Sequence, residues 1–326
     1  MTTTANTAAT AAAPVLTEDE LAAAEREMTE RTVRAMEVFE ETEPQVTSIR
    51  VLDTEQVTPG FMRITFGPDP LAPDVGAGHP FAFVGADQWF RLFVPAGGRH
   101  DGELQLPWGP SEGWFKRLGA MPEDVRPVCR NYTVRDFRQG ADTRSGAAWE
   151  FDVDFVLHRN GAGELEGIAA RWSTECVPGD RAGILGQSTM YDPEGEPGTV
   201  TILTDETGLP GVESIIRSRP AGSETTVLVT MAHRDDARPL ECASACHDCF
   251  FCPKNPKVHV RWLERESGES WERALDAHLA THAPDYFYAV GSQPMVLDAR
   301  KRAKAVGLTN EQIRFCAYWM PARVRG

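Results

Sequence analysis

The pattern of secondary structure changes near residue 198, and this change most constrains how the 326-residue chain can fold. Before it, short strand-like runs are separated by turns rich in Gly, Pro and Asp, which is typical of an antiparallel barrel or sandwich. After it, strand-like and helix-like segments alternate, as in a parallel sheet flanked by helices. The chain is also longer than most single cores, so we expect two domains.

The expected elements follow the two patterns. In the first half the strand-like runs cover 46–53, 61–66, 88–94, 131–137, 149–158 and 181–185. In the second half strands are expected at 200–203, 225–231, 257–263, 286–290 and 313–318, with helices at 211–217, 271–282 and 294–305. We therefore expect a barrel domain over 45–198 and an α/β domain over 199–326, with a cysteine-rich insertion at 240–256.

Residues 1–44 precede the first expected domain. The first 14 residues are rich in Ala and Thr, which predicts a disordered tail. Thr17 and Glu20 form a capping box, and apolar residues then recur at helical spacing to about Glu41. We expect an acidic helix here, packed either on the body of the protein or on a second subunit.

The formal net charge is −15. This charge argues against nucleic acid or an anionic membrane surface as the main partner, because phosphate binding needs a basic face. No apolar run approaches the length of about 18 residues that a membrane span requires, and the start does not have the pattern of a secretory signal. The sequence therefore predicts a cytoplasmic protein.

One strand carries the residue types that hold a flavin. Arg130 offers a planar guanidinium to a diphosphate, and Tyr132 lies two residues along on the same strand face. The Thr133 hydroxyl can form a hydrogen bond to the redox edge of a flavin near N5. An ordinary strand with one Tyr and two exposed Arg has the same pattern, so neighbouring segments have to decide between the two readings.

Two neighbouring segments strengthen the flavin hypothesis. An alternating strand ends at His158 before a Gly-rich stretch, and Ala169 and Ala170 can begin a helix whose free N–H groups approach a diphosphate. In the second half, residues 204–210 end the first strand and open a helix, at the sheet edge where ligands bind. An ordinary capped helix fits either segment as well.

In order, these segments resemble the siderophore-interacting protein family of ferric-siderophore reductases. The resemblance rests on residues 130–135, 153–158, 169–172, 178–180, 205–210 and 318–319. It implies a ferredoxin-reductase-like architecture, in which a six-stranded antiparallel barrel binds FAD and an α/β domain with a parallel sheet receives NADH or NADPH.

The resemblance also assigns residues to roles. It gives Arg130, Tyr132 and Thr133 to FAD, with Tyr132 and Thr133 nearest the chemistry, and His158 to the polar chain of the flavin. It places Ala169 and Ala170 at the pyrophosphate turn, Asp205, Glu206 and Thr207 near the cofactors, and Trp319 at the domain junction. Arg91 stands where the family commonly has Lys, so we expect Arg91, together with Arg323 and Arg325, to hold an anionic ferric siderophore. The chain departs from the family where it has Ser292 and Gln293 in place of a carboxylate and Met320 in place of a basic residue.

A run of four cysteines distinguishes this chain. Cys242, Cys246, Cys249 and Cys252 lie within eleven residues, and Pro253 follows the last of them. Compact thiols in a reducing compartment favour metal ligation over disulfides. The spacing allows an iron–sulfur cluster, a structural zinc with His247 as a possible ligand, or no metal. A cluster would make a ferredoxin-type protein as plausible an electron donor as NADH or NADPH.

Together these features predict an FAD-dependent ferric-siderophore reductase that releases iron as Fe(II). Two alternatives remain at this point. The chain could be a flavin oxidoreductase of siderophore or natural-product biosynthesis, or a non-enzymatic protein that binds a siderophore or a metal.

Overall fold

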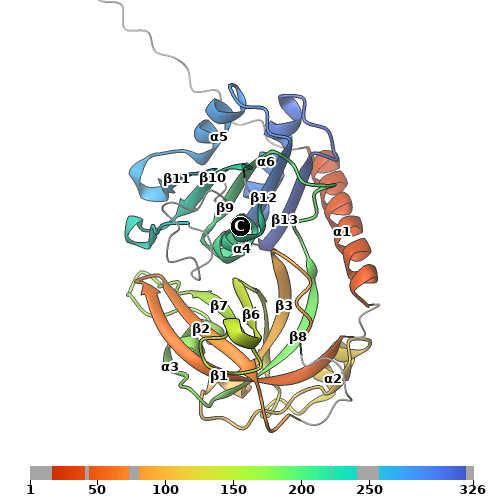
Figure 1. Cartoon of the computed structure of the whole chain (residues 1–326), viewed down its shortest axis with the longest axis vertical. Helices are drawn as coiled ribbons and strands as arrows, with labels where there is room; N and C mark the ends of the chain where they lie inside the picture. The colour runs from red at the N-terminus through yellow and green to blue at the C-terminus, as the bar shows by residue number, and fades with distance from the viewer. Residues whose placement is uncertain (1–16, 41–43, 73–80, 221, 241–256, 321–326) are drawn as a thin grey trace, which may run out of the picture.

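Two β-sheets, one antiparallel and one parallel, organise the chain (Figure 1). The structure is a computed structural model, and it describes residues 17–40, 44–72, 81–220, 222–240 and 257–320. The four cysteines at 242–252 and the predicted substrate residues Arg323 and Arg325 lie outside the described residues. The predicted combination of an antiparallel sheet with a separate parallel sheet is confirmed.

The antiparallel sheet has eight strands in the order β5-β3-β8-β1-β2-β7-β6, and β4 pairs with β1. Its strands are β1 (Gln45–Thr58), β2 (Phe61–Pro68), β3 (Gln88–Val94), β4 (Gly109–Pro110), β5 (Val128–Thr133), β6 (Asp136–Gln139), β7 (Trp149–Val156) and β8 (Arg181–Thr189). Alternation of side chains along β7 sends Phe151, Val153 and Phe155 into the core of this sheet. Two helices of this half, α2 (Trp114–Ala120) and α3 (Ile168–Glu175), pack on this sheet through Leu118 and Trp172.

The predicted six-stranded antiparallel barrel is observed as an antiparallel sheet of eight strands that no ladder of hydrogen bonds closes. The run expected as one strand at 131–137 divides into β5 and β6, which are the two edges of the sheet. At the break, the Val134 amide donates to the Gln88 carbonyl and the Arg135 amide donates to the Asp152 carbonyl. The first amide thus bonds to β3, the neighbour of β5, and the second to β7, the neighbour of β6, so the chain itself rather than a ladder joins the two edges.

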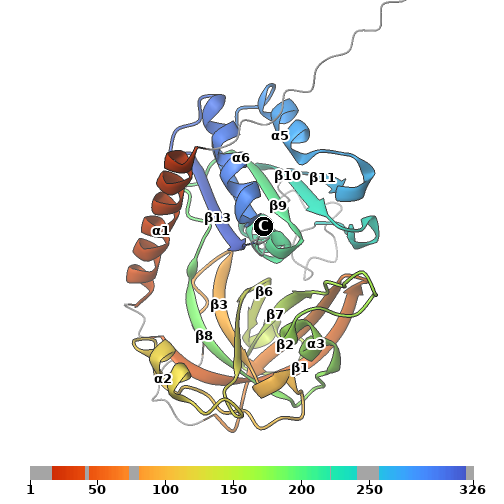
Figure 2. The same cartoon turned by 180° about the vertical axis from the view of Figure 1, so that it is seen from behind.

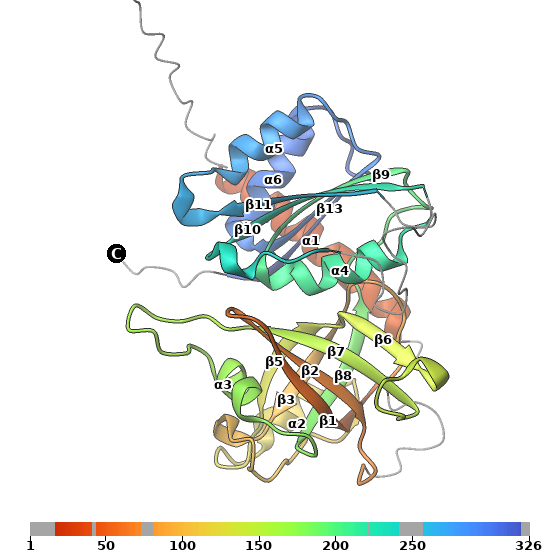
Figure 3. The ribbon, with the colours of Figure 1, turned by 60° about the vertical axis from the view of Figure 1, so that its left-hand side comes forward.

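The parallel sheet has five strands in the order β11-β10-β9-β12-β13. They are β9 (Thr199–Asp205), β10 (Glu224–Met231), β11 (Lys257–Glu264), β12 (Tyr286–Ser292) and β13 (Ile313–Trp319). The three helices of this half are α4 (Leu209–Ser218), α5 (Trp271–Leu279) and α6 (Gln293–Ala305). Figure 3 shows α5 and α6 on the outer face of the sheet and α4 on the face toward the antiparallel sheet. Helix α4 therefore lies at the junction of the two halves.

The first helix, α1 (Glu18–Glu40), packs on the body of the chain beside β13 (Figures 1 and 2). The predicted capping box is present, since the Thr17 amide donates to Glu20 Oε2 at 2.9 Å and the Glu20 amide donates to Thr17 Oγ1 at 3.2 Å. Further along, Arg31 donates to the carbonyls of Ile313 and Asn310 at 2.7 and 2.6 Å. Of the two docking sites that the sequence left open, the body of the protein is thus the one observed.

Among the described helices, none combines the length and the apolar character needed to cross a membrane.

Candidate functional site

A cavity of about 510 Å³ lies between the two halves of the chain. Its walls come from β3 and β5, the start of α3, the end of β13 and one side of α1. This volume falls within the range of about 300–1,000 Å³ that is usual for sites of cofactors and small ligands. The junction is therefore the candidate site.

Most of the predicted cofactor residues line this cavity. Those at its wall are Arg130, Tyr132, Thr133, His158, Ala169, Ala170, Thr207 and Trp319. Asp205 and Glu206 are not at the wall, and Arg91 lines a neighbouring hollow. The sequence did not single out Met28 and Thr32 of α1, which also line the cavity.

Strand β5 presents three different chemical groups to the cavity. The Arg130 guanidinium is exposed and donates to the Cys129 carbonyl at 2.7 Å, so most of its donors remain for a ligand. The Tyr132 ring is fixed against Phe155, with 4.3 Å between ring centroids. Thr133 is buried and directs its hydroxyl to the Tyr318 hydroxyl, 3.4 Å away. The strand thus offers a cation, an aromatic ring and a hydroxyl in sequence.

The start of α3 suits close approach by an anion. Its N-cap residue, Gly167, has φ of 90° and no side chain that could cap the first turn. The next residues, Ala169 and Ala170, are buried and small. Free N–H groups and the positive end of the helix dipole favour a negatively charged group at such a position.

Asp205 acts as an anchor behind the cavity. Its carboxylate accepts hydrogen bonds from the Thr207 amide at 2.9 Å, from the Ser292 amide at 2.8 Å and from Trp319 Nε1 at 2.9 Å. Burial raises the pKa of Asp205 although these donors favour the charged form. Asp205 therefore positions Trp319 and Thr207 at the cavity wall without lining it.

Glu206 is likewise occupied inside the protein. Its carboxylate pairs with both terminal nitrogens of Arg265, at 2.7 and 2.6 Å, and accepts from the Ala232 amide at 2.6 Å. The carboxyl edge of β9 thus carries two buried carboxylates whose oxygens bond to the chain itself. Because both side chains are acidic, neither can attract a nucleotide phosphate to this edge.

Arg91 lies between two indole rings. Its guanidinium carbon is 5.1 Å from the Trp89 ring centroid and 4.5 Å from that of Trp114. One terminal nitrogen donates to Asn131 Oδ1 at 3.2 Å. Arg91 lines a hollow of about 670 Å³ that also contains Arg126 and Arg130 and adjoins the main cavity.

A group of hydroxyls around a buried carboxylate was not found from the sequence. Asp87 is fully buried and accepts from the hydroxyls of Tyr288 and Tyr318, at 2.5 and 2.6 Å. Tyr318 in turn faces Thr133. We call Asp87, Tyr288 and Tyr318 the phenol junction. The three residues come from segments about 200 positions apart, so spacing along the chain could not reveal them.

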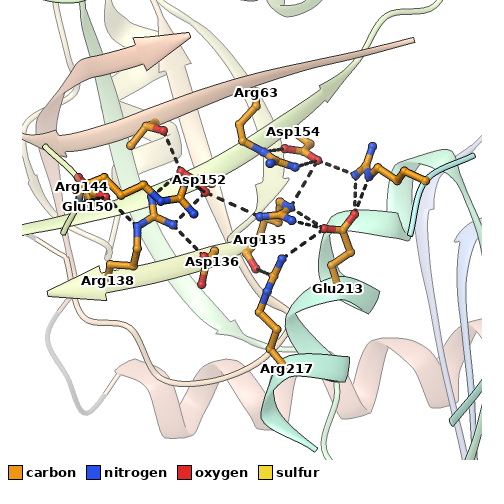
Figure 4. Close-up of polar contacts among 12 residues, drawn as sticks. Arg63, Arg135, Asp136, Arg138, Arg144, Glu150, Asp152, Asp154, Glu213 and Arg217 are labelled. Carbon is orange, nitrogen blue, oxygen red and sulfur yellow. Dashed lines mark hydrogen bonds and ion pairs between the residues drawn. The ribbon is translucent and has the colours of Figure 1, made fainter. Parts of the chain in front are cut away.

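A second group of contacts across the junction is charged (Figure 4). From the antiparallel sheet come Arg63, Arg135 and Asp154, and from the other half come Glu213 and Arg217 of α4 together with Arg238. We call these six residues the charged junction. Arg135 Nε lies 2.6 Å from Glu213 Oε2, and Arg238 Nη2 lies 2.7 Å from Asp154 Oδ2. Both bonds cross from one half to the other.

The residues at the cavity fit an FAD molecule. They supply a guanidinium and a helix start for a diphosphate, aromatic rings for a planar ring system, and a buried hydroxyl for its polar edge. In addition, Trp89 Nε1 is buried at the wall and has no hydrogen-bond partner among the described residues. A buried donor without an acceptor is costly, and a bound ligand with an acceptor atom would satisfy it.

An antiparallel sheet, a parallel sheet and a cavity between them define a ferredoxin-reductase-like class of protein. The chain belongs to the siderophore-interacting protein family. A profile of the siderophore-interacting FAD-binding domain matches residues 50–190, and a profile of the siderophore-interacting protein matches residues 198–322. Family and fold together support a flavin-dependent function associated with siderophores.

Solved structures share this fold. The siderophore-interacting protein SipS from Aeromonas hydrophila is 18% identical, with 86% of this chain and 100% of that chain covered and a TM-score of 0.58. A siderophore utilization protein from T. fusca is 24% identical, with 86% and 94% covered and a TM-score of 0.58. The ferredoxin reductase in carbazole 1,9a-dioxygenase is 14% identical, with 85% and 70% covered and a TM-score of 0.55.

A relative of known sequence is much longer than this chain. The mycobactin import ATP-binding/permease protein IrtA of Mycobacterium tuberculosis is 23% identical over 280 residues, which are 85% of this chain and 26% of that protein. The chain thus spans about a quarter of that relative's length.

Proposed function

We propose that this protein is an FAD-dependent ferric-siderophore reductase that releases iron as Fe(II) in the cytoplasm. The observation that carries the proposal is the cavity at the junction, where Arg130, Tyr132 and Thr133 of β5 face the start of α3 and Trp319. When bound there, FAD supplies the chemistry, since a flavin accepts two electrons and can release them one at a time.

The residues of the chain bind and orient the cofactor. Arg130 would pair with the diphosphate in a charge-assisted contact, and the small residues Ala169 and Ala170 would let the diphosphate approach the N-terminus of α3. Thr133 would offer its hydroxyl to the polar edge of the ring system, and Trp319, held by Asp205, would pack against the cofactor. His158 is exposed at the wall, where it would contact the polar chain of the flavin.

Arg91 is the residue that we propose to attract the ferric siderophore. Its cation is held by Trp89 and Trp114 at the wall of the adjoining hollow, with Arg126 and Arg130 nearby. This local group of three arginines can attract an anionic chelate although the chain as a whole is negatively charged. Distant acidic residues matter little, because screening limits the influence of each charge to about 8 Å at physiological salt. Arg323 and Arg325 remain part of this proposal from the sequence alone.

The electron donor is NADH, NADPH or a ferredoxin-type protein. Asp205 and Glu206 are bonded to the chain itself, and the basic residue beside them, Arg265, is paired with Glu206. The four cysteines at 242–252 remain a prediction of an iron–sulfur or zinc site. Iron, zinc and sulfide analysis of anaerobically purified protein, followed by reduction with each donor, decides both points.

The proposal is tested by anaerobic turnover. Protein loaded with FAD is reduced and mixed with a ferric siderophore, and Fe(II) is trapped by a ferrous chelator as the flavin absorbance returns. We expect two Fe(II) per flavin in wild type and a raised KM in Arg91→Ala, with partial rescue in Arg91→Lys. Arg99→Ala is the matched control, because Arg99 is close to Arg91 in the sequence but its side chain is largely exposed. Turnover that does not need ferric iron would overturn the proposal.

A further inference from the structure

Asp87 sits at the end of a hydrogen-bond chain that begins at the cavity. The Thr133 hydroxyl faces the Tyr318 hydroxyl at 3.4 Å, and the Tyr318 hydroxyl donates to Asp87 Oδ1 at 2.6 Å. Thr133 and Tyr318 line the cavity, whereas Asp87 is fully buried behind them. The first separation is long for two hydroxyls, and such contacts in ligand-free sites commonly tighten when the ligand binds.

The backbone holds Asp87 in a conformation that few residues adopt. Its φ is 57°, and among the described residues it is the only one other than glycine with a positive φ. Strained backbone persists where the surrounding structure enforces it, and it concentrates at functional sites. Helix α4 packs directly on the carboxylate of this residue, because a Cβ added at Gly211 would lie 1.9 Å from Asp87 Oδ1.

The groups that face Asp87 come from β12 and β13. They are the hydroxyls of Tyr288 and Tyr318, the guanidinium of Arg314 and the thiol of Cys316. Burial raises the pKa of Asp87 to about 6, although both tyrosines and Arg314 favour the carboxylate. Burial also raises the pKa of Cys316 to about 12, so this thiol keeps its proton near neutral pH.

We propose that Asp87 accepts, through Tyr318 and Thr133, the proton that leaves the flavin N5 position when the reduced cofactor is oxidised. This inference rests on the proposed function, and it adds a proton acceptor to it. The directions of the hydrogen bonds in the structure agree with it, since Thr133 donates to Tyr318 and Tyr318 donates to Asp87.

The step balances for two irons. The reduced cofactor is taken in its anionic form, with a proton at N5 and none at N1, so two electrons pass to two ferric ions, which become two ferrous ions, and one proton leaves N5. Thr133 Oγ1 accepts this proton and gives its own hydroxyl proton to Tyr318, which gives its own to the Asp87 carboxylate. Refilling by single electrons takes the proton back along the same chain. Refilling by a nicotinamide hydride brings its own hydrogen, so Asp87 then loses its proton to solvent through the cavity.

Three variants separate proton transfer from structure. Tyr318→Phe and Tyr288→Phe each remove one phenol bond from Asp87, but only Tyr318 connects Asp87 to Thr133. Asp87→Asn keeps the shape of the side chain and tolerates the positive φ, since Asn is among the residues that adopt it. Near-ultraviolet circular dichroism confirms that each variant is folded.

The first readout is the pH profile of cofactor oxidation. FAD-loaded protein is reduced, mixed anaerobically with ferric citrate and followed by flavin absorbance from pH 5 to 9. In wild type the rate should rise with pH through about 6, where Asp87 becomes ionised and can accept a proton. Asp87→Asn and Tyr318→Phe should lose this rise and fall by about 10²-fold at pH 8. Tyr288→Phe should keep the rise with its midpoint moved to higher pH.

The second readout needs no cofactor. In infrared spectra of the FAD-free protein, the carboxylic acid band of Asp87 should appear with a midpoint near pH 6 and should be missing in Asp87→Asn. Equal effects of Tyr318→Phe and Tyr288→Phe, or an unchanged pH profile in Asp87→Asn, would overturn the relay while the reductase function stands. A wild-type protein that takes up no FAD would overturn both.

Discussion

The charged junction and the phenol junction both join the two halves of the chain, but their chemistry is opposite. In the charged junction, three arginines surround Glu213, and burial of its carboxylate is outweighed by Arg135, Arg238 and Arg217, which lower its pKa. In the phenol junction, Asp87 meets two neutral hydroxyls, and burial raises its pKa to about 6. A buried carboxylate thus stays ionised to lower pH where cations meet it, and titrates closer to neutral pH where hydroxyls meet it.

The difference separates a structural contact from a candidate for chemistry. The charged junction lies between β7 and α4, and most of its oxygens and nitrogens bond to each other. The phenol junction borders the cavity through Tyr318. A group with a pKa near the working pH can exchange a proton at low cost, whereas a strongly paired ion cannot.

The largest expected effect comes from Glu213→Gln. Removing the only carboxylate that α4 gives to the charged junction leaves Arg135, Arg217 and Arg238 short of a buried partner. We expect the free energy of unfolding to fall by about 3–5 kcal/mol. The control is Glu269→Gln, which removes the exposed ion pair with Arg261. Here the free energy of unfolding should change by less than about 1 kcal/mol. Urea unfolding measures both, and equal losses would contradict the account.

Much of the fold could be predicted from the sequence because it depends on local patterns. The alternation of strand and helix after residue 198 gives the parallel sheet, and the capping box at Thr17 gives the start of α1. The opening of the antiparallel sheet at Val134 and Arg135 could not be predicted, because it depends on which edge each amide meets.

The site divides in the same way. Arg130 and Tyr132 lie two residues apart on one strand, so their common position at the cavity followed from strand geometry, whereas Thr133 reaches the cavity at the end of the strand. Asp87 and the tyrosines of the phenol junction come together only through the packing of two halves. The acidic residues of β7 read as an alternating strand, and nothing in that pattern shows that arginines from both halves cover them.

The next effect tests the close packing at the phenol junction. In Gly211→Ala the new Cβ would overlap Asp87 Oδ1, so α4 or Asp87 must move. Overpacking of this kind costs about 1–3 kcal/mol. The control is Gly119→Ala in α2, where nothing lies within 4 Å and the better helix propensity of Ala should stabilise by up to about 1 kcal/mol. Thermal unfolding measures whether each substitution raises or lowers stability, and stabilisation by both would contradict this expectation.

The smallest effect is a pH dependence with opposite signs at the two junctions. The raised pKa of Asp87 gives stability that is complete below its unfolded value of 3.8 and lost as pH rises through about 6. The free energy of unfolding of wild type, relative to that of Asp87→Asn, should therefore be about 1.4 kcal/mol higher at pH 5 than at pH 8. The lowered pKa of Glu213 acts in the other direction, since its stability is lost as pH falls below 4.5. Urea unfolding at several pH values would contradict this if both differences changed with the same sign.

A titration of FAD fluorescence shows whether the cavity at the junction binds FAD. Ala170 lies buried at the cavity wall, so Ala170→Glu places a negative charge where the diphosphate is proposed to bind. Ala120→Glu, on the exposed end of α2, is the matched control. We expect one FAD bound per chain in wild type and in Ala120→Glu, and none in folded Ala170→Glu. Equal binding by all three proteins would contradict it.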